Sequence, residues 1–500
     1  MNNITELLRK DYSIVLPNGK TVTSEYLHIL KNYYKKRIFD VLDGKTVGKR
    51  GVIWSNNLDV VFPCLTAMWE LGVAAAMHNF EGVVVGHPVF KNFYQDVDFV
   101  VACGTAADSV FTEAPHIPAP YSQMDMYSYY NKLPEEPIYQ FKIDEYPDVD
   151  YALDSSIDGN TIATVSYVCG KNGQPGVYQL SHHDACRVIK ENIKLFNFSD
   201  SDRVLHTKSL YHGTLFLQYT MPALATTSIH YWADWRFTVG SNEEYRKDFM
   251  HLLSTVIDTC YTEHITKCLL PPGWIEELIN CSAVRLPNTS ILTIAGPDTS
   301  KMKELFDRFD FQAVYNNFGS SEVGSSIAVE KTTKSNLDNY DPMRFNIINP
   351  LVDLEIYDQY FKGKLKTKAT WSILPDRIEI NNDVFIFHGP SNLVTIKGVE
   401  INLQELNEKL AVCFNTKIFS LIVDPELDKL YVAFFYQGSG MSCEQINQYI
   451  AKYISPDISI SKTAAFNVQG PFNEISPTRF ITPAVLLHAF QNQSVTDYRD

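Results

Sequence analysis

The chain has 500 residues, more than a single hydrophobic core usually supports, so at least two domains are expected. Apolar residues make up 45% of the chain and charged residues 20%, which is typical of globular proteins and excludes a disordered or fibrous chain. The 58 acidic residues outnumber the 43 Lys and Arg residues, and the net charge of -15 repels phosphate backbones and anionic membrane surfaces. Nucleic acid is therefore not an expected partner, and any anionic substrate must be held by local groups.

The cysteines and the N-terminus indicate a cellular location. Nine cysteines are scattered without a Cys-x-x-Cys pair or a zinc-ligand spacing, which predicts small core residues or free thiols. The N-terminal sequence MNNITELLRKDYSIVL carries charges where a secretion signal needs an apolar stretch, so a cytoplasmic protein is expected. The most apolar segment, residues 60–77, is interrupted by Pro63, Glu70 and Gly72, so no membrane insertion is expected.

Strands and helices alternate along the first part of the chain. A strand at 52–54, a helix at 59–71 and a strand at 73–77 form a β-α-β unit, which predicts a parallel sheet. The same alternation predicts strands at 98–102, 162–168, 203–206 and 290–295 and helices at 183–196 and 300–309. Residues 115–151, rich in Tyr and Pro, are expected to be irregular, and the Lys35-Lys36-Arg37 run is expected on the solvated face of a helix. This pattern predicts an α/β domain with helices covering the sheets.

The pattern changes after about residue 340. From 351 to 397 the segments LVDLEIYD, KLKTKAT, DRIEIN, DVFIFHG and LVTIK alternate at period two, which predicts short antiparallel strands. A helix at 403–413, strands at 419–423 and 429–435 and a helix at 442–454 then predict a small α+β domain, joined near 389–392. The fold class is therefore α/β, with a large N-terminal domain at 1–390 and a small α+β C-terminal domain at 391–500.

A glycine-rich segment, VCGKNGQPGVYQLSH at 168–182, follows one predicted strand and precedes one predicted helix. Glycines allow a backbone to turn tightly and to approach an anion. The glycines are Gly170, Gly173 and Gly176, and the side chains that can donate to phosphate oxygens are Lys171, Asn172 and Ser181. The alternative is an ordinary strand-to-helix connection, in which Gly and Pro are common.

A second segment, YNNFGSSEVG at 315–324, places two hydroxyls and a carboxylate in sequence after Gly319. Phosphate needs short donors and magnesium needs a hard oxygen ligand, and Ser320, Ser321 and Glu322 supply both. Phe318 can stack on a base. The alternative is a helix N-cap with Glu in the first turn, which would explain Ser321 and Glu322 equally well.

In their order and spacing, these segments resemble the acyl-adenylate-forming superfamily of acyl-CoA synthetases, nonribosomal peptide synthetase adenylation domains and luciferases. The resemblance covers nearly the whole chain. VCGKNGQPGVYQLSH is similar to the family's phosphate loop, T-S-G-T-T-G-x-P-K-G-x-x-x-S-H, and NFGSSE at 317–322 is similar to N-x-G-x-T-E. GPSNLVTIKGVEINLQEL resembles the family's hinge and the start of its mobile C-terminal domain.

The resemblance implies a role for each matching residue. Glu322 would hold magnesium, Ser321 would contact the α-phosphate, and Phe318 would take the place of a tyrosine that stacks on adenine. The implied catalytic set is Ser321, Glu322, His212, Lys171 and Arg479. The implied nucleotide-binding set is Gly170, Lys171, Asn172, Gly173, Gly296, Pro297, Asn317, Phe318, Gly319, Ser320, Ser321 and Asp376.

Three of these assignments come from shorter motifs. Gly296 and Pro297, in IAGP, resemble the turn beside the adenine. Asp376 stands where the family has the aspartate that binds both ribose hydroxyls, and its alternative is an ordinary turn carboxylate before a strand. His212, in SLYHGTL, matches a histidine that lines the acyl or aryl pocket, and its alternative is a core histidine.

The sequence departs from the family at its cations. The phosphate loop has Lys171 and Asn172 in place of two threonines and Gly176 in place of a lysine. The C-terminal motif G-K-x-x-R has ISPTR at 475–479 as its nearest counterpart, in which Arg479 fits but the lysine is missing. Lys171, Lys462 and Arg479 are the candidates to replace the missing cations.

The resemblance implies an ATP-dependent carboxylate-activating ligase that forms an acyl- or aryl-adenylate and passes the acyl group to a thiol or amine. It also implies ATP or AMP with Mg²⁺, a small carboxylic acid, and coenzyme A or a phosphopantetheine carrier protein as acceptor. One alternative is a non-catalytic relative that binds a nucleotide or an adenylate as a scaffold or regulator. Another is an enzyme that keeps only the acyl-transfer half-reaction. The oligomeric state stays open.

Overall fold

The structure is a computed structural model in which a defined set of residues is described. These residues are 3–15, 19, 21–54, 58–77, 96–102, 114–118, 148–153, 156–169, 175–207, 216–233, 242–270, 272–293, 298–320, 323–357, 361–374, 376–390, 393–396, 399–403, 406, 409–410, 418–424, 429–435, 443–453 and 459–466. The fold class predicted from the sequence, α/β with helix-covered sheets followed by antiparallel strands, is confirmed.

The first sheet has six strands in the order β6-β5-β3-β4-β7-β8. Their bounds are β3 (Arg50–Trp54), β4 (Ala74–Met77), β5 (Phe99–Ala102), β6 (His116–Pro118), β7 (Ile162–Cys169) and β8 (Pro175–Ser181). All neighbouring pairs are parallel except β7 with β8. The helix α2 (Leu58–Glu70) joins β3 to β4, so the predicted β-α-β unit is confirmed.

The second sheet has nine strands in the order β16-β14-β13-β12-β11-β9-β10-β1-β2. Their bounds are β1 (Ser13–Val15), β2 (Thr21–Thr23), β9 (Arg203–His206), β10 (Ile229–Trp232), β11 (Lys267–Leu269), β12 (Ser290–Thr293), β13 (Ala313–Ser320), β14 (Ser325–Thr332) and β16 (Ile347–Ile348). The strands from β13 to β1 are parallel, and β14, β16 and β2 are antiparallel to their neighbours.

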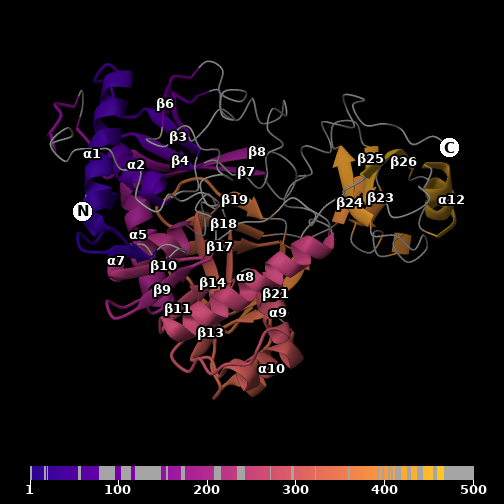
Figure 1. Ribbon diagram of the computed structural model, residues 1–500. Coiled ribbons are helices and arrows are strands. Elements are labelled where there is room, and N and C mark those ends of the chain that lie inside the picture. Colours follow the sequence, from indigo (N-terminus) through magenta and orange to yellow (C-terminus); the bar gives the residue numbers. More distant parts are fainter. Residues whose placement is uncertain are drawn as a thin grey trace.

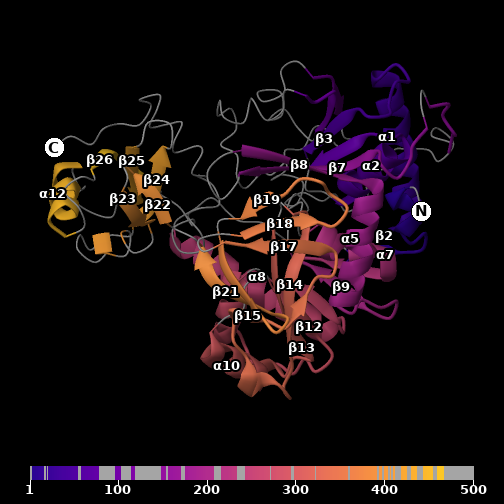
Figure 2. The ribbon, with the colours of Figure 1, turned by 180° about the vertical axis from the view of Figure 1, so that it is seen from behind.

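Helices cover both faces of this sheet (Figures 1 and 2). On one face, Leu205 and Val314 pack in one core with α8 (Asn242–Thr262), α9 (Pro272–Glu277) and α10 (Thr299–Phe309). On the other face, Val204 and Tyr315 share a core with the end of α5 (His182–Leu195), with η5 (Phe216–Thr220) and with α7 (Met221–Thr226). Successive strand residues point to opposite faces, so these neighbours enter different cores.

Two three-stranded antiparallel sheets follow. One contains β15 (Arg344–Phe345), β21 (Val384–Pro390) and β20 (Asp376–Asn381), and the other contains β17 (Val352–Ile356), β18 (Phe361–Leu365) and β19 (Ser372–Leu374). The strand predicted over KLKTKAT is wrong in its bounds. The strand β18 ends at Leu365, where the amide of Lys368 donates back to the Leu365 carbonyl at 2.8 Å. The buried anchors of this strand, Phe361 and Leu365, lie at its two ends, and no apolar side chain follows until Ala369.

The C-terminal elements form sheets of their own. They are β22 (Leu393–Ile396) with β23 (Val399–Asn402), β24 (Ile418–Asp424) with β25 (Lys429–Phe435) and β26 (Ile460–Phe466), and the helix α12 (Cys443–Tyr453). Across the described ranges, none of these strands joins a sheet of residues 3–390, and Figure 1 shows them together in orange and yellow. The domain boundary at 390 stays a prediction.

The described cysteines agree with the predicted core role. Five thiols in the described ranges are free and buried, namely Cys64, Cys186, Cys260, Cys268 and Cys281. Burial raises the pKa of the Cys186 thiol to about 11, so this thiol stays protonated at neutral pH.

A buried charge cluster joins α2 to α1 (Ser24–Val41). The Lys31 and Lys35 ammonium nitrogens each lie 2.9 Å from a different carboxylate oxygen of Glu70, and each lies 3.9 Å from Asp148. Lys31 is 7% exposed and Lys35 is 6% exposed. The expectation that Lys35 lies on a solvated face is therefore wrong, because α2 covers it, whereas the next residue, Lys36, is exposed as predicted.

We expect Glu70→Gln to destabilise the fold by roughly 3 kcal/mol, because two nearly buried ammonium groups would lose their shared carboxylate. Asp40→Asn is the matched control, since it removes the exposed Lys36–Asp40 pair on α1, the helix that also carries Lys31 and Lys35. This control should leave the free energy of unfolding nearly unchanged, because both side chains of the pair are exposed. Urea unfolding of both variants measures the difference, and equal losses would contradict a structural role for the cluster.

Candidate functional site

Three of the predicted segments directly follow parallel strands of the nine-stranded sheet. The strand β9 ends before residues 208–215, which contain His212, β12 ends before residues 294–297, and β13 ends before Ser321 and Glu322. These strands run in the same direction in the order β13-β12-β11-β9, so their carboxyl ends lie at one edge of the sheet. Ligands of open α/β sheets bind outside this edge.

The strand β13 leads into an antiparallel hairpin. Thr293, the last residue of β12, pairs with Asn316, and residues 317–320 complete β13. The strand then turns back into β14, and the Ser320 carbonyl accepts from the Gly324 amide at 2.9 Å. The alternative of a helix N-cap at Ser321 and Glu322 is therefore wrong, because these residues lie between two antiparallel strands. Gly324 has a φ of 75°, a conformation that favours glycine.

One face of the β13 end contacts a buried amide from η5. The Asn317 Nδ2 atom donates to the Gln218 Oε1 atom at 2.8 Å, and both side chains are buried. Gly319 lies on the same face, where an added Cβ atom would lie 2.7 Å from the Gln218 Nε2 atom. A side chain at position 319 would therefore require the Gln218 amide to move.

The other face carries Phe318. Its ring centroid lies 5.0 Å from that of Phe385 and 5.1 Å from that of Phe387, both on β21. The rings of Phe345 and Phe361 lie 6.0 and 6.2 Å away. These aromatic contacts hold the half-buried ring in place. The stacking of Phe318 on adenine stays a prediction.

Asp376 is the first residue of β20 and is 2% exposed. It pairs with Pro390 across a bulge in the β20–β21 ladder. The alternative drawn from the sequence is an ordinary turn carboxylate before a strand, and the ribose role of Asp376 stays a prediction. A buried carboxylate is costly without polar partners, and Asp376 has an interaction of its own within the protein.

The glycine-rich segment lies between two antiparallel strands. Cys169 at the end of β7 pairs with Pro175 at the start of β8, so residues 170–174 connect the two strands. The predicted strand-to-helix connection is therefore wrong, because β8 separates this loop from α5. Ser181 caps α5 by accepting from the Asp184 amide at 3.2 Å, and it lies roughly 20 Å along β8 from the loop. The expectation that Ser181 contacts phosphate is also wrong.

Of the predicted site residues, the structure describes Asn317, Phe318, Gly319, Ser320 and Asp376. The others lie outside the described residues, and they are Gly170, Lys171, Asn172, Gly173, His212, Gly296, Pro297, Ser321, Glu322 and Arg479. For Lys462, on β26, only the backbone is described. In the described part of the chain, no cluster of three His, Cys, Asp or Glu residues can hold a metal ion.

Known proteins resemble this chain in part of its sequence and in its overall fold. No family model matches the sequence. A D-alanine–D-alanyl carrier protein ligase of Lactococcus lactis is 24% identical over 226 residues, and this stretch covers 44% of the chain and 42% of the ligase. The matched stretch thus spans about two fifths of the relative.

Solved structures match nearly the whole chain. ATP-bound MatB from Rhodopseudomonas palustris has a TM-score of 0.62 at 12% identity, covering 94% of this chain and 97% of that one. The O-succinylbenzoate coenzyme A synthetase MenE from Bacillus subtilis, in complex with ATP and a magnesium ion, has a TM-score of 0.63 at 13% identity, covering 93% of this chain and 96% of that one. This chain has the fold of the acyl-adenylate-forming superfamily.

Two buried features of this adenylate-forming fold were missed from the sequence. One is Gln218, a lone amide in the apolar run FLQYTMPAL, and that polarity was the available signal. The other is a histidine pair, in which the His206 Nε2 atom lies 3.1 Å from the His230 Nδ1 atom. Burial lowers the pKa of His230 to about 4, so the pair is neutral at physiological pH. His206 ends β9 and is stacked on Trp232, with ring centroids 5.7 Å apart.

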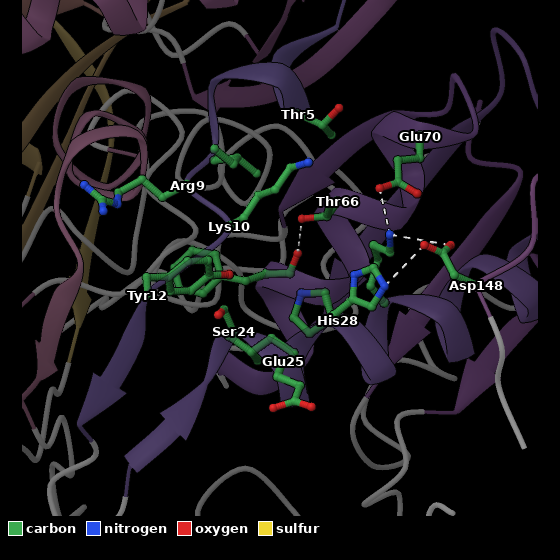
Figure 3. A pocket seen from close by; sticks show the side chains of 15 residues that line it. Thr5, Arg9, Lys10, Tyr12, Ser24, Glu25, His28, Thr66, Glu70 and Asp148 are labelled. Atoms are coloured by element: carbon green, nitrogen blue, oxygen red, sulfur yellow. Dashed lines mark hydrogen bonds and ion pairs between the residues drawn. The ribbon is translucent and has the colours of Figure 1, made fainter. Parts of the chain in front are cut away.

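A cavity of about 490 Å³ lies elsewhere, between the N-terminal segment and the helices α1 and α2 (Figure 3). None of the predicted site residues lines it. Its charged lining residues are Arg9, Lys10, Lys31, Glu25, Glu70 and Asp148, with His28 beside them. Cations and carboxylates are equal in number, so this cavity offers no net charge to attract a nucleotide.

In the part of the chain that the structure describes, no helix has both the length and the apolar character needed to cross a membrane. The cytoplasmic location inferred from the N-terminus stays a prediction.

His182, next to Ser181, ties the N-terminus to α5. Its Nδ1 atom accepts from the Ile4 amide at 3.1 Å, and burial lowers the pKa of His182 from 6.5 to about 4. Between these values the unfolded chain binds a proton that the folded chain does not. The contribution of neutral His182 to the stability of the fold is therefore complete above pH 6.5 and is lost as the pH falls toward 4.

We expect His182→Asn, which keeps an acceptor but cannot titrate here, to reduce the acid-induced loss of stability by about 2 kcal/mol. Thermal unfolding between roughly pH 7 and roughly pH 4 measures the slope of stability against pH, because this range includes the pKa values of His182 in the unfolded and the folded chain. The exposed neighbour His183 supplies the control, since His183→Asn should leave the slope unchanged. The same slope in all three proteins would contradict the assignment.

Proposed function

We propose that this protein is an ATP-dependent carboxylate-activating ligase. A carboxylate oxygen attacks the α-phosphorus of ATP, the bond from phosphorus to the pyrophosphate oxygen breaks, and an acyl-adenylate forms. A thiol or amine then displaces AMP. The observation that carries the proposal is the common edge at which β9, β12 and β13 end, directly before the segments that match the superfamily's motifs.

The nucleotide would lie along this edge. Residues 317–320 form the carboxyl end of β13, the position at which ligands of open α/β sheets bind. The adenine would contact Phe318 and the turn at Gly296 and Pro297, and Asp376 would bind the ribose hydroxyls. The loop that contains Gly170, Lys171, Asn172 and Gly173 would hold the leaving pyrophosphate through its amides.

Glu322 and Ser321 would act at the α-phosphate. In the β13–β14 turn, Glu322 would hold a magnesium ion, which neutralises phosphate charge when bound. Ser321 would donate to an α-phosphate oxygen.

The acid would bind beside the segment after β9, where His212 would line its pocket. A small carboxylic acid is proposed as substrate. The thiol of coenzyme A or of a carrier protein is proposed as acceptor, since the relative is a carrier protein ligase and MenE is a coenzyme A synthetase.

The missing lysines support a second candidate. Removing one preorganised donor typically costs about 10²- to 10³-fold in rate, so the departures at Gly176 and in ISPTR at 475–479 must be compensated for catalysis. Lys171, Lys462 and Arg479 are the proposed substitutes. Without them, the protein would bind a nucleotide or an adenylate without making one, or would keep only the acyl transfer.

Pyrophosphate exchange with a panel of carboxylic acids tests the proposal, together with mass spectrometry of any ligand retained by the purified protein. Acid-dependent exchange supports the ligase. Retained AMP binding with no exchange for any acid favours the non-catalytic candidate, and transfer from a supplied acyl-adenylate without exchange favours the half-reaction.

We expect Asp376→Asn to raise the KM for ATP by about 10- to 100-fold and to leave the KM for the acid unchanged, because a charge-assisted contact to the ribose would be lost. Glu379→Gln is the control, since Glu379 lies on the same strand but is exposed. An ATP KM that is equal in both variants would remove Asp376 from the nucleotide site.

We expect Glu322→Gln to lower the exchange rate by about 10²- to 10³-fold, because the amide is a weaker ligand for magnesium. The magnesium concentration that gives half-maximal exchange should also rise. Glu304→Gln, at an exposed position on α10, should change neither quantity. A Glu322→Gln protein with the wild-type rate and magnesium dependence would exclude a role for Glu322 as metal ligand.

A further inference from the structure

Gln218 is an isolated buried amide next to the candidate site. It lies in η5, a π-helical turn that begins directly after residues 208–215, the segment that contains His212. The side chain is only 2% exposed, although its neighbours Leu217 and Tyr219 are apolar core residues. Single π-helical turns are rare in proteins, and those that occur are often found at functional sites. A buried amide in such a turn therefore needs an explanation beyond packing.

The polar partner of Gln218 comes from the far end of β13. The Gln218 Oε1 atom accepts from the Asn317 Nδ2 atom at 2.8 Å, across 99 residues of chain. The other amide atoms of the pair, Gln218 Nε2 and Asn317 Oδ1, have no hydrogen-bond partner in the described part of the chain. A single hydrogen bond therefore joins two buried side chains.

The same side chain also fixes the backbone of the β13 end. An added Cβ atom at Gly319 would lie 2.7 Å from the Gln218 Nε2 atom, so the amide lies directly against this backbone. Asn317 and Gly319 are two residues apart on one strand and share a face. The next residues are Ser320 and then the turn that contains Ser321 and Glu322. Gln218 thus contacts β13, the strand that leads into this turn.

We propose that Gln218 is a positioning residue for acyl-adenylate formation, an inference that rests on the proposed function. Its amide sets the position of η5 relative to the end of β13, the strand that leads to the residues proposed to hold the α-phosphate. Gln218 acts through Asn317 and Gly319. Attack on phosphorus requires reacting atoms aligned to about 3 Å, and a misplacement of about 1 Å can cost 10²-fold in rate.

The first test is Gln218→Met, which keeps the length of the side chain and removes the amide. We expect kcat for exchange to fall by about 10- to 100-fold while the KM for ATP stays within about twofold, because alignment is lost but nucleotide contacts are kept. Adding Asn317→Leu to Gln218→Met should lower kcat little further, since the two side chains align the site as one unit, whereas the KM for ATP should rise because Asn317 is also a proposed nucleotide contact. Full additivity of the two losses in kcat would overturn the proposal.

A matched control separates positioning from simple loss of a buried hydrogen bond. Asn192 on α5 is fully buried and accepts from the Ser326 hydroxyl at 3.0 Å, and Ser326 pairs with Gly319 across the same hairpin. Asn192→Leu should lower the unfolding temperature about as much as Gln218→Met does, and it should leave kcat nearly unchanged. Equal losses of kcat in the two variants would overturn the proposal.

Hydrogen exchange gives a readout that does not need activity. We expect Gln218→Met to speed amide exchange in residues 317–326 of the intact protein, and Asn192→Leu to leave residues 317–320 at the wild-type rate. Unchanged exchange in Gln218→Met would overturn the proposal even in an inactive protein. Absence of pyrophosphate exchange in the wild type would instead contradict the proposed function and would leave this measurement to decide the role of Gln218.

Discussion

The candidate site depends on the parallel alignment of β9, β11, β12 and β13. The carboxyl ends of parallel strands lie at the same edge, so strand ends more than a hundred residues apart in sequence share that edge. The alignment is stable because helices bury both faces, with Leu205 and Val314 in one core and Val204 and Tyr315 in the other. Since both faces are covered, polar chemistry is confined to the strand ends.

Buried polar groups set the geometry at this edge. A hydrogen bond between Gln218 and Asn317 joins η5 to the end of β13, and Gly319 lets these two segments approach closely. The Phe318 ring is held on the opposite face by the phenylalanines of β21. A strand end that is fixed on both faces needs little reorganisation when charge develops beside it, and such preorganisation is a main source of catalytic power. The end of β13, which leads to the residues proposed to meet the phosphates, is therefore held on both faces.

Sequence patterns predicted the regular elements well where periodicity was strong. The β3-α2-β4 unit and the helices α5 and α10 begin and end within two residues of their predicted bounds. Errors arose where one local pattern fits two folds. Glycines and a hydroxyl before a helix predicted a strand-to-helix connection at 168–182, but β8 intervenes. Ser321 and Glu322 allowed an N-cap until the pairing of β13 with β14 excluded it. The charges of Lys35 indicated solvent, but α2 covers that side chain.

The sequence by itself determined the fold class, the alternation of strands and helices, and the motifs whose order resembles the acyl-adenylate-forming superfamily. Periodicity and short motifs are local, so they can be read without knowing which segments meet. Only the tertiary structure decided that β9, β12 and β13 share an edge, that Gln218 reaches Asn317, and that Asp376 is buried. These facts depend on contacts between residues up to about a hundred positions apart. The net charge of -15 excluded global attraction of phosphate, and the sheet edge is where local groups would replace it.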